Sequence, residues 1–151
     1  MLRLPKLNFP AIRLRARRQG AQVEIWDALR GQYLVLTPEE WVRQHLVAYL
    51  VSHCGAQPGR IVAEYAVALN GQPQRADVVV VDGCARPLLV AECKAPDVPV
   101  NEKVLSQVVR YNSVLGARYV VLTNGRVHGC YECRDGRYVP LVHFPDLTAG
   151  A

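Results

Sequence analysis

The stretch "PLLVAECKAP", residues 87–96, ends an apolar run with two charged side chains, Glu92 and Lys94. Side chains alternate between the two faces of a strand, so Glu92 and Lys94 would share one face while Cys93 lies on the other. Taken alone, this pair fits a solvent-exposed ion pair at a strand end better than it fits half of an active site. The choice between the two depends on what the fold brings beside it.

A second buried strand is predicted by "RADVVVVD", residues 75–82, because its continuous apolar run is typical of a strand covered on both faces. If this strand pairs antiparallel with residues 87–93, Asp77 at the start of one lies beside Glu92 and Lys94 at the end of the other. Neighbouring carboxylates repel unless a cation lies between them, and oxygen ligands suit Mg²⁺ or Mn²⁺. The sequence therefore predicts a divalent-metal site at this edge of the sheet, with Lys94 beside it.

A helix is predicted to begin after Thr37, which is a favoured N-cap residue, and to end before Gly55. Glu39 lies on the same helical face as the apolar residues, whereas Glu40 is about 100° away. Glu39 is therefore the preferred third acid for the metal site. It could equally form an i, i+4 ion pair with Arg43.

A second amphipathic helix is predicted over residues 100–116 and would end at Gly116. It presents Gln107 and Tyr111 one turn apart on the same face, so that both can reach the same point. They are candidate catalytic residues if this helix covers the strand that carries Glu92.

The composition is that of an ordinary globular protein, with 50% hydrophobic and 21% charged residues among 151. No apolar run approaches the ~20 residues of a membrane helix, and residues 1–18 lack the apolar core of a signal peptide. We therefore expect a cytoplasmic protein without membrane contact. Five cysteines do not form a secreted disulfide framework. Cys130 and Cys133 have half of a zinc-site spacing, and a structural metal would need Cys54, Cys84 or a histidine to complete it.

Positive charge is concentrated near the N-terminus, where residues 1–30 hold seven cations and two anions. An alternating pattern over residues 12–25, turning at Gln19-Gly20, predicts a β-hairpin with one cationic face. Arginine binds phosphate bidentately, so this face could contact nucleic acid, although a solvated basic strand explains the charge equally well. The candidate nucleic-acid-binding residues are Arg13, Arg15, Arg17 and Arg18.

The order of elements predicts an α/β fold with a central mixed sheet flanked by helices. A hairpin and a helix precede three strands, a second helix and a further strand. Residues 126–133 and 137–144 are then predicted as edge strands joined by Asp135-Gly136. No internal repeat or linker divides the sequence, so residues 1–151 are expected to form one domain.

Several motifs together resemble the N-terminal nuclease domain of type I restriction enzyme R subunits, a branch of the PD-(D/E)XK nuclease superfamily. They are "TPEEWVRQH", "RADVVVVD", "LLVAECKAP", "QVVRYN" and "VLTNG", in this order between about Leu36 and Tyr131. The resemblance implies a restriction-endonuclease-like three-layer core over residues 37–133, with a basic hairpin leader over 1–36 and an edge strand and tail over 134–151. The proline that often precedes the family aspartate is absent, since the local sequence is "QRAD".

The same resemblance implies a Mg²⁺- or Mn²⁺-dependent deoxyribonuclease. Asp77 and Glu92 would bind the metal, Lys94 would assist phosphodiester hydrolysis, and Gln107 and Tyr111 would support activity. R subunits also carry an ATP-driven translocase, which these 151 residues do not include. We expect DNA as the substrate, and a motor or specificity subunit or a second copy of the chain as partner. The alternative is a catalytically silent DNA-binding or accessory module of a restriction or repair complex.

Overall fold

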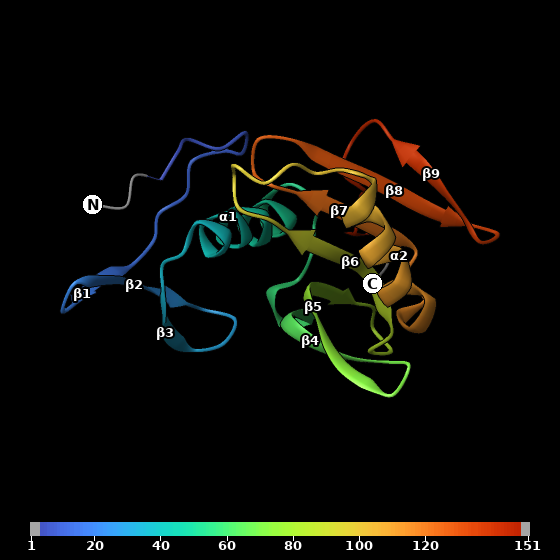
Figure 1. Cartoon of the computed structure of the whole chain (residues 1–151), viewed down its shortest axis with the longest axis horizontal. Helices are drawn as coiled ribbons and strands as arrows, with labels where there is room; N and C mark the ends of the chain where they lie inside the picture. The colour runs from blue at the N-terminus through green and yellow to red at the C-terminus, as the bar shows by residue number, and fades with distance from the viewer. Residues whose placement is uncertain (1–3, 149–151) are drawn as a thin grey trace.

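The computed structural model describes residues 4–148, and the first three and last three residues lie outside it. It contains two β-sheets and two α-helices (Figure 1). The N-terminal sheet is formed by β1 (Ala16–Gln19), β2 (Gln22–Asp27) and β3 (Gln32–Val35). The remaining elements are α1 (Pro38–Ser52), β4 (Ile61–Leu69), β5 (Gln72–Val81), β6 (Pro87–Cys93), α2 (Glu102–Leu115), β7 (Tyr119–Thr123), β8 (His128–Arg134) and β9 (Arg137–Leu141), with a short 3₁₀ turn at Pro58–Arg60.

Both predicted helices are confirmed, together with the Thr37 cap of α1 and the end of α2 at Gly116; α1 itself ends at Ser52, with His53 as its C-cap. The Thr37 hydroxyl accepts a hydrogen bond from the Glu40 amide at 3.0 Å, which satisfies one of the free donors in the first turn of α1. Helix α2 begins after Asn101, whose side chain caps the Lys103 and Val104 amides. It ends at Gly116 in the left-handed conformation, with φ 67°.

The large sheet is mixed and has the strand order β4-β5-β6-β7-β8-β9. Every neighbouring pair is antiparallel except β6 and β7, which are parallel and are connected through α2. A parallel pair needs such a crossover because the chain must return to the same end of the sheet. Strand β8 lies between β7 and β9, so its prediction as an edge strand is wrong, and β9 is the edge.

The two helices cover opposite faces of the large sheet. On β5, Val78 and Val80 belong to the core cluster that contains Val42 and Leu46 of α1. Val79, between them, belongs to the cluster that contains residues of α2. Alternate residues of a strand point to opposite faces, so the continuous apolar run is explained by a helix on each side (Figure 1).

The N-terminal sheet has three strands, so the predicted two-stranded hairpin is incomplete. The turn at Gln19-Gly20 joins β1 and β2 as predicted, and β3 then pairs antiparallel with β2. Residues 32–35, "QYLV", are too short and too mixed in polarity to give a strand signal by themselves. Their pairing is a tertiary effect that the local sequence does not encode.

The segment before β1 is attached to the large sheet and to α1. The Asn8 amide donates to the Gly125 carbonyl at 2.7 Å, and the Trp41 indole donates to the Pro5 carbonyl at 2.9 Å. His128 Nε2 lies 2.9 Å from the Asn8 carbonyl oxygen. The described helices include none that is both long and apolar enough to cross a membrane.

Candidate metal and nuclease site

The pairing of β5 with β6 brings Asp77 and Glu92 together. Their ladder is antiparallel, as predicted, and toward this end it pairs Val79 with Val90 and Val78 with Ala91. The next step along this register places Asp77 opposite Glu92. The Cys93 amide donates to Asp77 Oδ2 at 2.8 Å, which fixes the orientation of the Asp77 carboxylate.

Burial raises the pKa of both carboxyl groups. Asp77 is 8% exposed and Glu92 is 5% exposed. Burial raises the pKa of Asp77 to about 6, although the Cys93 amide and Arg43 oppose the rise. Burial and the Asp77 charge raise the pKa of Glu92 to about 8, although Lys94 opposes it. Two buried carboxylates this close disfavour double ionisation, so the metal-free site takes up a proton at a higher pH than an isolated carboxyl group does.

The Glu92 carboxylate has an oxygen atom that could bind a cation. Its Oε2 atom is buried and has no hydrogen-bond partner among residues 4–148, and Lys94 Nζ lies 3.7 Å from Oε1. An unpartnered carboxylate oxygen beside a second carboxylate is a donor set that suits Mg²⁺, which binds through one or two carboxylates and keeps several waters. The described part of the chain has no group of three or more His, Cys, Asp and Glu side chains that could hold a metal. The residues present thus fit an ion held by two carboxylates.

Gln107 and Tyr111 contact each other on α2. Gln107 Nε2 donates to the Tyr111 hydroxyl at 3.1 Å, as expected for residues one turn apart. Tyr111 is buried in the cluster that contains Val90 of β6. No hydrogen bond within residues 4–148 joins this pair to Asp77, Glu92 or Lys94.

The two acids at the start of α1 have different environments. Glu39 is exposed, yet its charge contributes to the raised pKa of both Asp77 and Glu92, so it lies within electrostatic range of the site. Glu40 is the buried acid, which its helical phase did not predict. It binds Arg30 at 2.9 Å and Arg43 at 3.3 Å.

Arg43 and Glu64 are polar residues near the site that the sequence did not indicate. The Arg43 guanidinium donates to Glu64 Oε1 at 2.7 Å and to the Asp77 carbonyl at 3.3 Å. The possible ion pair of Arg43 with Glu39 does not form, because Arg43 binds Glu40 and Glu64 instead. Only the i, i+3 spacing of Arg43 from Glu40 signalled part of this arrangement.

The four N-terminal arginines are exposed, but they do not share one face. The pairing of Arg17 with Glu24 and of Arg18 with Val23 places these two arginines on opposite sides of β1. Arg17 forms an ion pair with Glu24 at 2.8 Å, and its guanidinium lies 3.8 Å from the centre of the Tyr33 ring. The guanidinium carbon of Arg15 lies 5.8 Å from the centre of the Trp26 ring. The expectation of a single cationic face is therefore wrong for Arg18.

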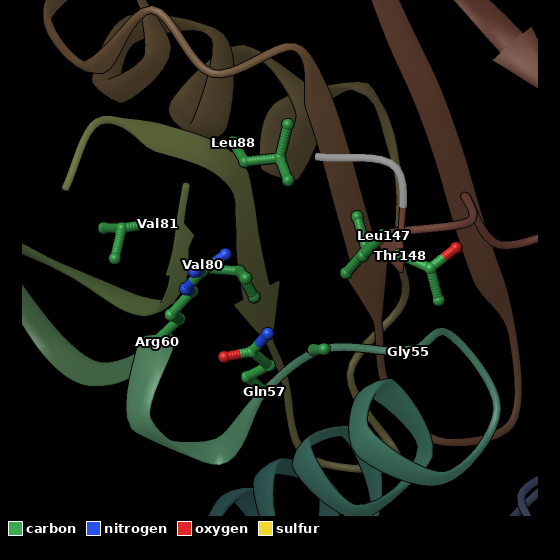
Figure 2. Close-up of a pocket in the computed structure, with 9 residues that line it drawn as sticks. Gly55, Gln57, Arg60, Val80, Val81, Leu88, Leu147 and Thr148 are labelled. Atoms are coloured by element: carbon green, nitrogen blue, oxygen red, sulfur yellow. The ribbon is translucent and has the colours of Figure 1, made fainter. Parts of the chain in front are cut away.

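A small cavity lies away from the two carboxylates, whereas Cys93 follows Glu92 directly and donates its amide to Asp77. A cavity of about 20 Å³ is lined by Gly55, Val80, Leu88 and Leu147 (Figure 2). Leu88 is near the start of β6, whereas Glu92 is near its end. It has the size of a water molecule and cannot take a substrate. All five cysteines are free thiols.

The sequence matches the family model for the type I restriction enzyme R protein N terminus (HSDR_N) over residues 38–145. The chain therefore belongs to this family, and the predicted family resemblance is confirmed. No curated protein matches the chain.

Among solved structures, the chain is similar to a fragment of a Vibrio vulnificus protein assigned as the HsdR subunit of a type I restriction enzyme. The TM-score is 0.57 and the sequence identity is 23%. The match covers 73% of this chain and 24% of the other, so the matched part spans about a quarter of that fragment. At this identity the similarity supports the fold alone.

Proposed function

We propose that this chain is a Mg²⁺- or Mn²⁺-dependent deoxyribonuclease domain of a restriction system, with a restriction-endonuclease-like three-layer core. The observation that carries the proposal is the buried pair of Asp77 and Glu92, with an unpartnered Glu92 oxygen and Lys94 within 3.7 Å. Membership of the R-subunit family supports the restriction context. Residues 1–151 are proposed to act as one nuclease-like domain.

Asp77, Glu92 and the Cys93 carbonyl would hold the metal, and Glu39 would add negative charge from α1. A bound Mg²⁺ supplies positive charge that lowers the pKa of an attacking water and neutralises the phosphate. Lys94 would orient that water or stabilise charge developing on the phosphate oxygens. Gln107 and Tyr111 would position the acidic and basic groups.

Phosphate contacts outside the site would come from Arg13 and Arg15, in the segment before β1, and from Arg17 on β1, whereas Arg18 could contact DNA only from the other side of that strand. Duplex DNA is large relative to this chain, so a second copy or a motor or specificity subunit would complete the groove. The competing function is an accessory module without turnover. The exposed position of Glu39 favours the accessory function, because only two buried acids, Asp77 and Glu92, then remain to bind the metal.

The test is cleavage of supercoiled, linear and single-stranded DNA with Mg²⁺ or Mn²⁺ by the wild type and by Lys94→Ala. We expect the cleavage rate of the variant to fall at least about 100-fold, as for removal of one preorganised charge-stabilising donor. Its fold and DNA affinity should stay near those of the wild type. If the wild type cuts none of these substrates but binds DNA equally well with and without metal, the accessory function is the correct one.

A further inference from the structure

We infer that Arg43 and Glu64 are positioning residues that hold Asp77 for metal binding. This inference rests on the proposed function, because it concerns the same site. It starts from an irregularity in β4, where Glu64 adopts φ 56° inside a strand. A side chain with a Cβ atom strongly disfavours this left-handed conformation, so a glycine would be the ordinary residue there.

The irregularity lies directly opposite the proposed metal ligand. The ladder between β4 and β5 pairs Ala63 with Val78 and Tyr65 with Ala76, and it skips the step between them. That step places Glu64 opposite Asp77. Backbone strain of this kind persists where the surrounding structure holds it in place, and it is concentrated at functional sites.

The Glu64 side chain gives a reason for keeping a non-glycine residue at this position. Its carboxylate accepts a hydrogen bond from Arg43 Nη1 at 2.7 Å, and the same nitrogen donates to the Asp77 carbonyl at 3.3 Å. Glu40 lies 3.3 Å from Arg43 Nε, on the other edge of the guanidinium. Arg43 is thus oriented by two acids and contacts the Asp77 backbone from α1. The Cys93 amide holds the Asp77 side chain from β6.

This arrangement constrains Asp77 through both its main chain and its side chain. Residues that orient a metal ligand from behind commonly change metal affinity by about 10- to 100-fold when they are removed. Glu64 is the better residue to vary, because its side chain is 32% exposed whereas that of Arg43 is 8% exposed. Its replacement should leave the protein folded.

The experiment measures Mn²⁺ binding by electron paramagnetic resonance, without DNA, for the wild type and for Glu64→Ala, Glu64→Gln and Glu64→Gly. We expect Glu64→Ala to weaken Mn²⁺ binding about 10-fold. Glu64→Gln keeps an oxygen acceptor for Arg43 and should stay within about threefold of the wild type. Glu64→Gly relieves the left-handed backbone, so it should unfold at a higher temperature than Glu64→Ala and yet bind Mn²⁺ no better.

The matched control is Ala85→Gly. Ala85 is exposed and also has positive φ, at 61°, but it lies in the turn between β5 and β6. This change should raise the unfolding temperature by a few degrees, roughly 2–4 °C, and leave Mn²⁺ binding unchanged. A purely structural role for Glu64 would instead make metal affinity follow thermal stability across all variants.

Three outcomes would overturn the inference. Equal Mn²⁺ affinity in Glu64→Ala and the wild type contradicts it while leaving the proposed function intact. An equal weakening in Glu64→Gln and Glu64→Ala that disappears at high salt, about 0.5 M, would show that Glu64 acts only through long-range charge, which salt screens. A wild type that binds no Mn²⁺ would overturn this inference and the proposed metal-dependent function together.

Discussion

Replacing Glu92 by glutamine should change how the stability of the metal-free protein depends on pH. The pKa of Glu92 is raised from 4.5 to about 8 in the folded protein. An unfolded chain would lose this proton near the ordinary value, so unfolding releases a proton between these two pH values. The free energy of unfolding contributed by Glu92 is therefore fully present below about pH 4.5 and falls as the pH rises toward 8.

The size of this effect follows from the same pKa difference. Each pKa unit corresponds to about 1.4 kcal/mol, so the whole shift corresponds to about 5 kcal/mol. At about pH 8 the folded Glu92 is only half ionised, so the stability of the wild type should have fallen by about 4 kcal/mol from its value at about pH 4 because of Glu92. Glutamine has nearly the same volume and cannot ionise. We expect Glu92→Gln to match the wild type near pH 4.5 and to exceed its stability by about 4 kcal/mol at pH 8.

The assay is urea denaturation followed by circular dichroism in EDTA, at several pH values from about 4.5 to 8.5. Glu102→Gln, which removes an exposed carboxylate in the first turn of α2, serves as the control and should follow the wild type. Saturating Mn²⁺ at about pH 8 should stabilise the wild type and not Glu92→Gln, because a ligand stabilises only the state that binds it. Parallel stability curves for the wild type and Glu92→Gln across this pH range would refute the reasoning.

Two further changes test other parts of the molecule. Joint replacement of Arg13, Arg15 and Arg17 by glutamine should weaken DNA binding. It should also lower the slope of log affinity against log salt by about 0.9 for each DNA phosphate that these arginines neutralise in the wild type. Arg137→Gln on β9 is the control, and an unchanged slope in a filter-binding or anisotropy titration would show that DNA binds elsewhere. Thr37→Ala removes the N-cap of α1 and should cost about 1 kcal/mol in the free energy of unfolding without changing Mn²⁺ affinity, as urea denaturation and metal titration can show; an unchanged stability would mean that the Thr37 hydroxyl contributes little to the helix.

Much of the fold could be predicted because its signals are local. Thr37 and Gly116 mark a helix start and a helix end by their own chemistry, and Gln19-Gly20 marks the turn between β1 and β2. The position of Asp77 beside Glu92 needed one further assumption, the antiparallel pairing of two buried strands. A short connection between two apolar runs made that assumption reasonable.

The parts that could not be predicted depend on contacts between distant segments. Strand β3 forms because it can pair with the free edge of β2. Glu40 is buried because its carboxylate binds Arg30, which lies in the turn before β3. Glu64 shows no sequence signal for its left-handed backbone, since a lone glutamate in a strand-like run predicts an ordinary extended residue. The sequence predicts Arg43 as an exposed residue of a helix. It is buried because the strand that carries Asp77 packs against this part of α1.

The N-terminal sheet is anchored on both sides. Before β1, Asn8 is bonded to Gly125 in the loop that follows β7. After β3, the chain enters α1 within two residues. These attachments at both ends limit how far the sheet can move relative to the body of the protein. If its arginines bind DNA as proposed, the distance between the bound phosphates and the Asp77 and Glu92 carboxylates would stay nearly constant. The DNA would then be cut at a fixed distance from the point where the sheet holds it.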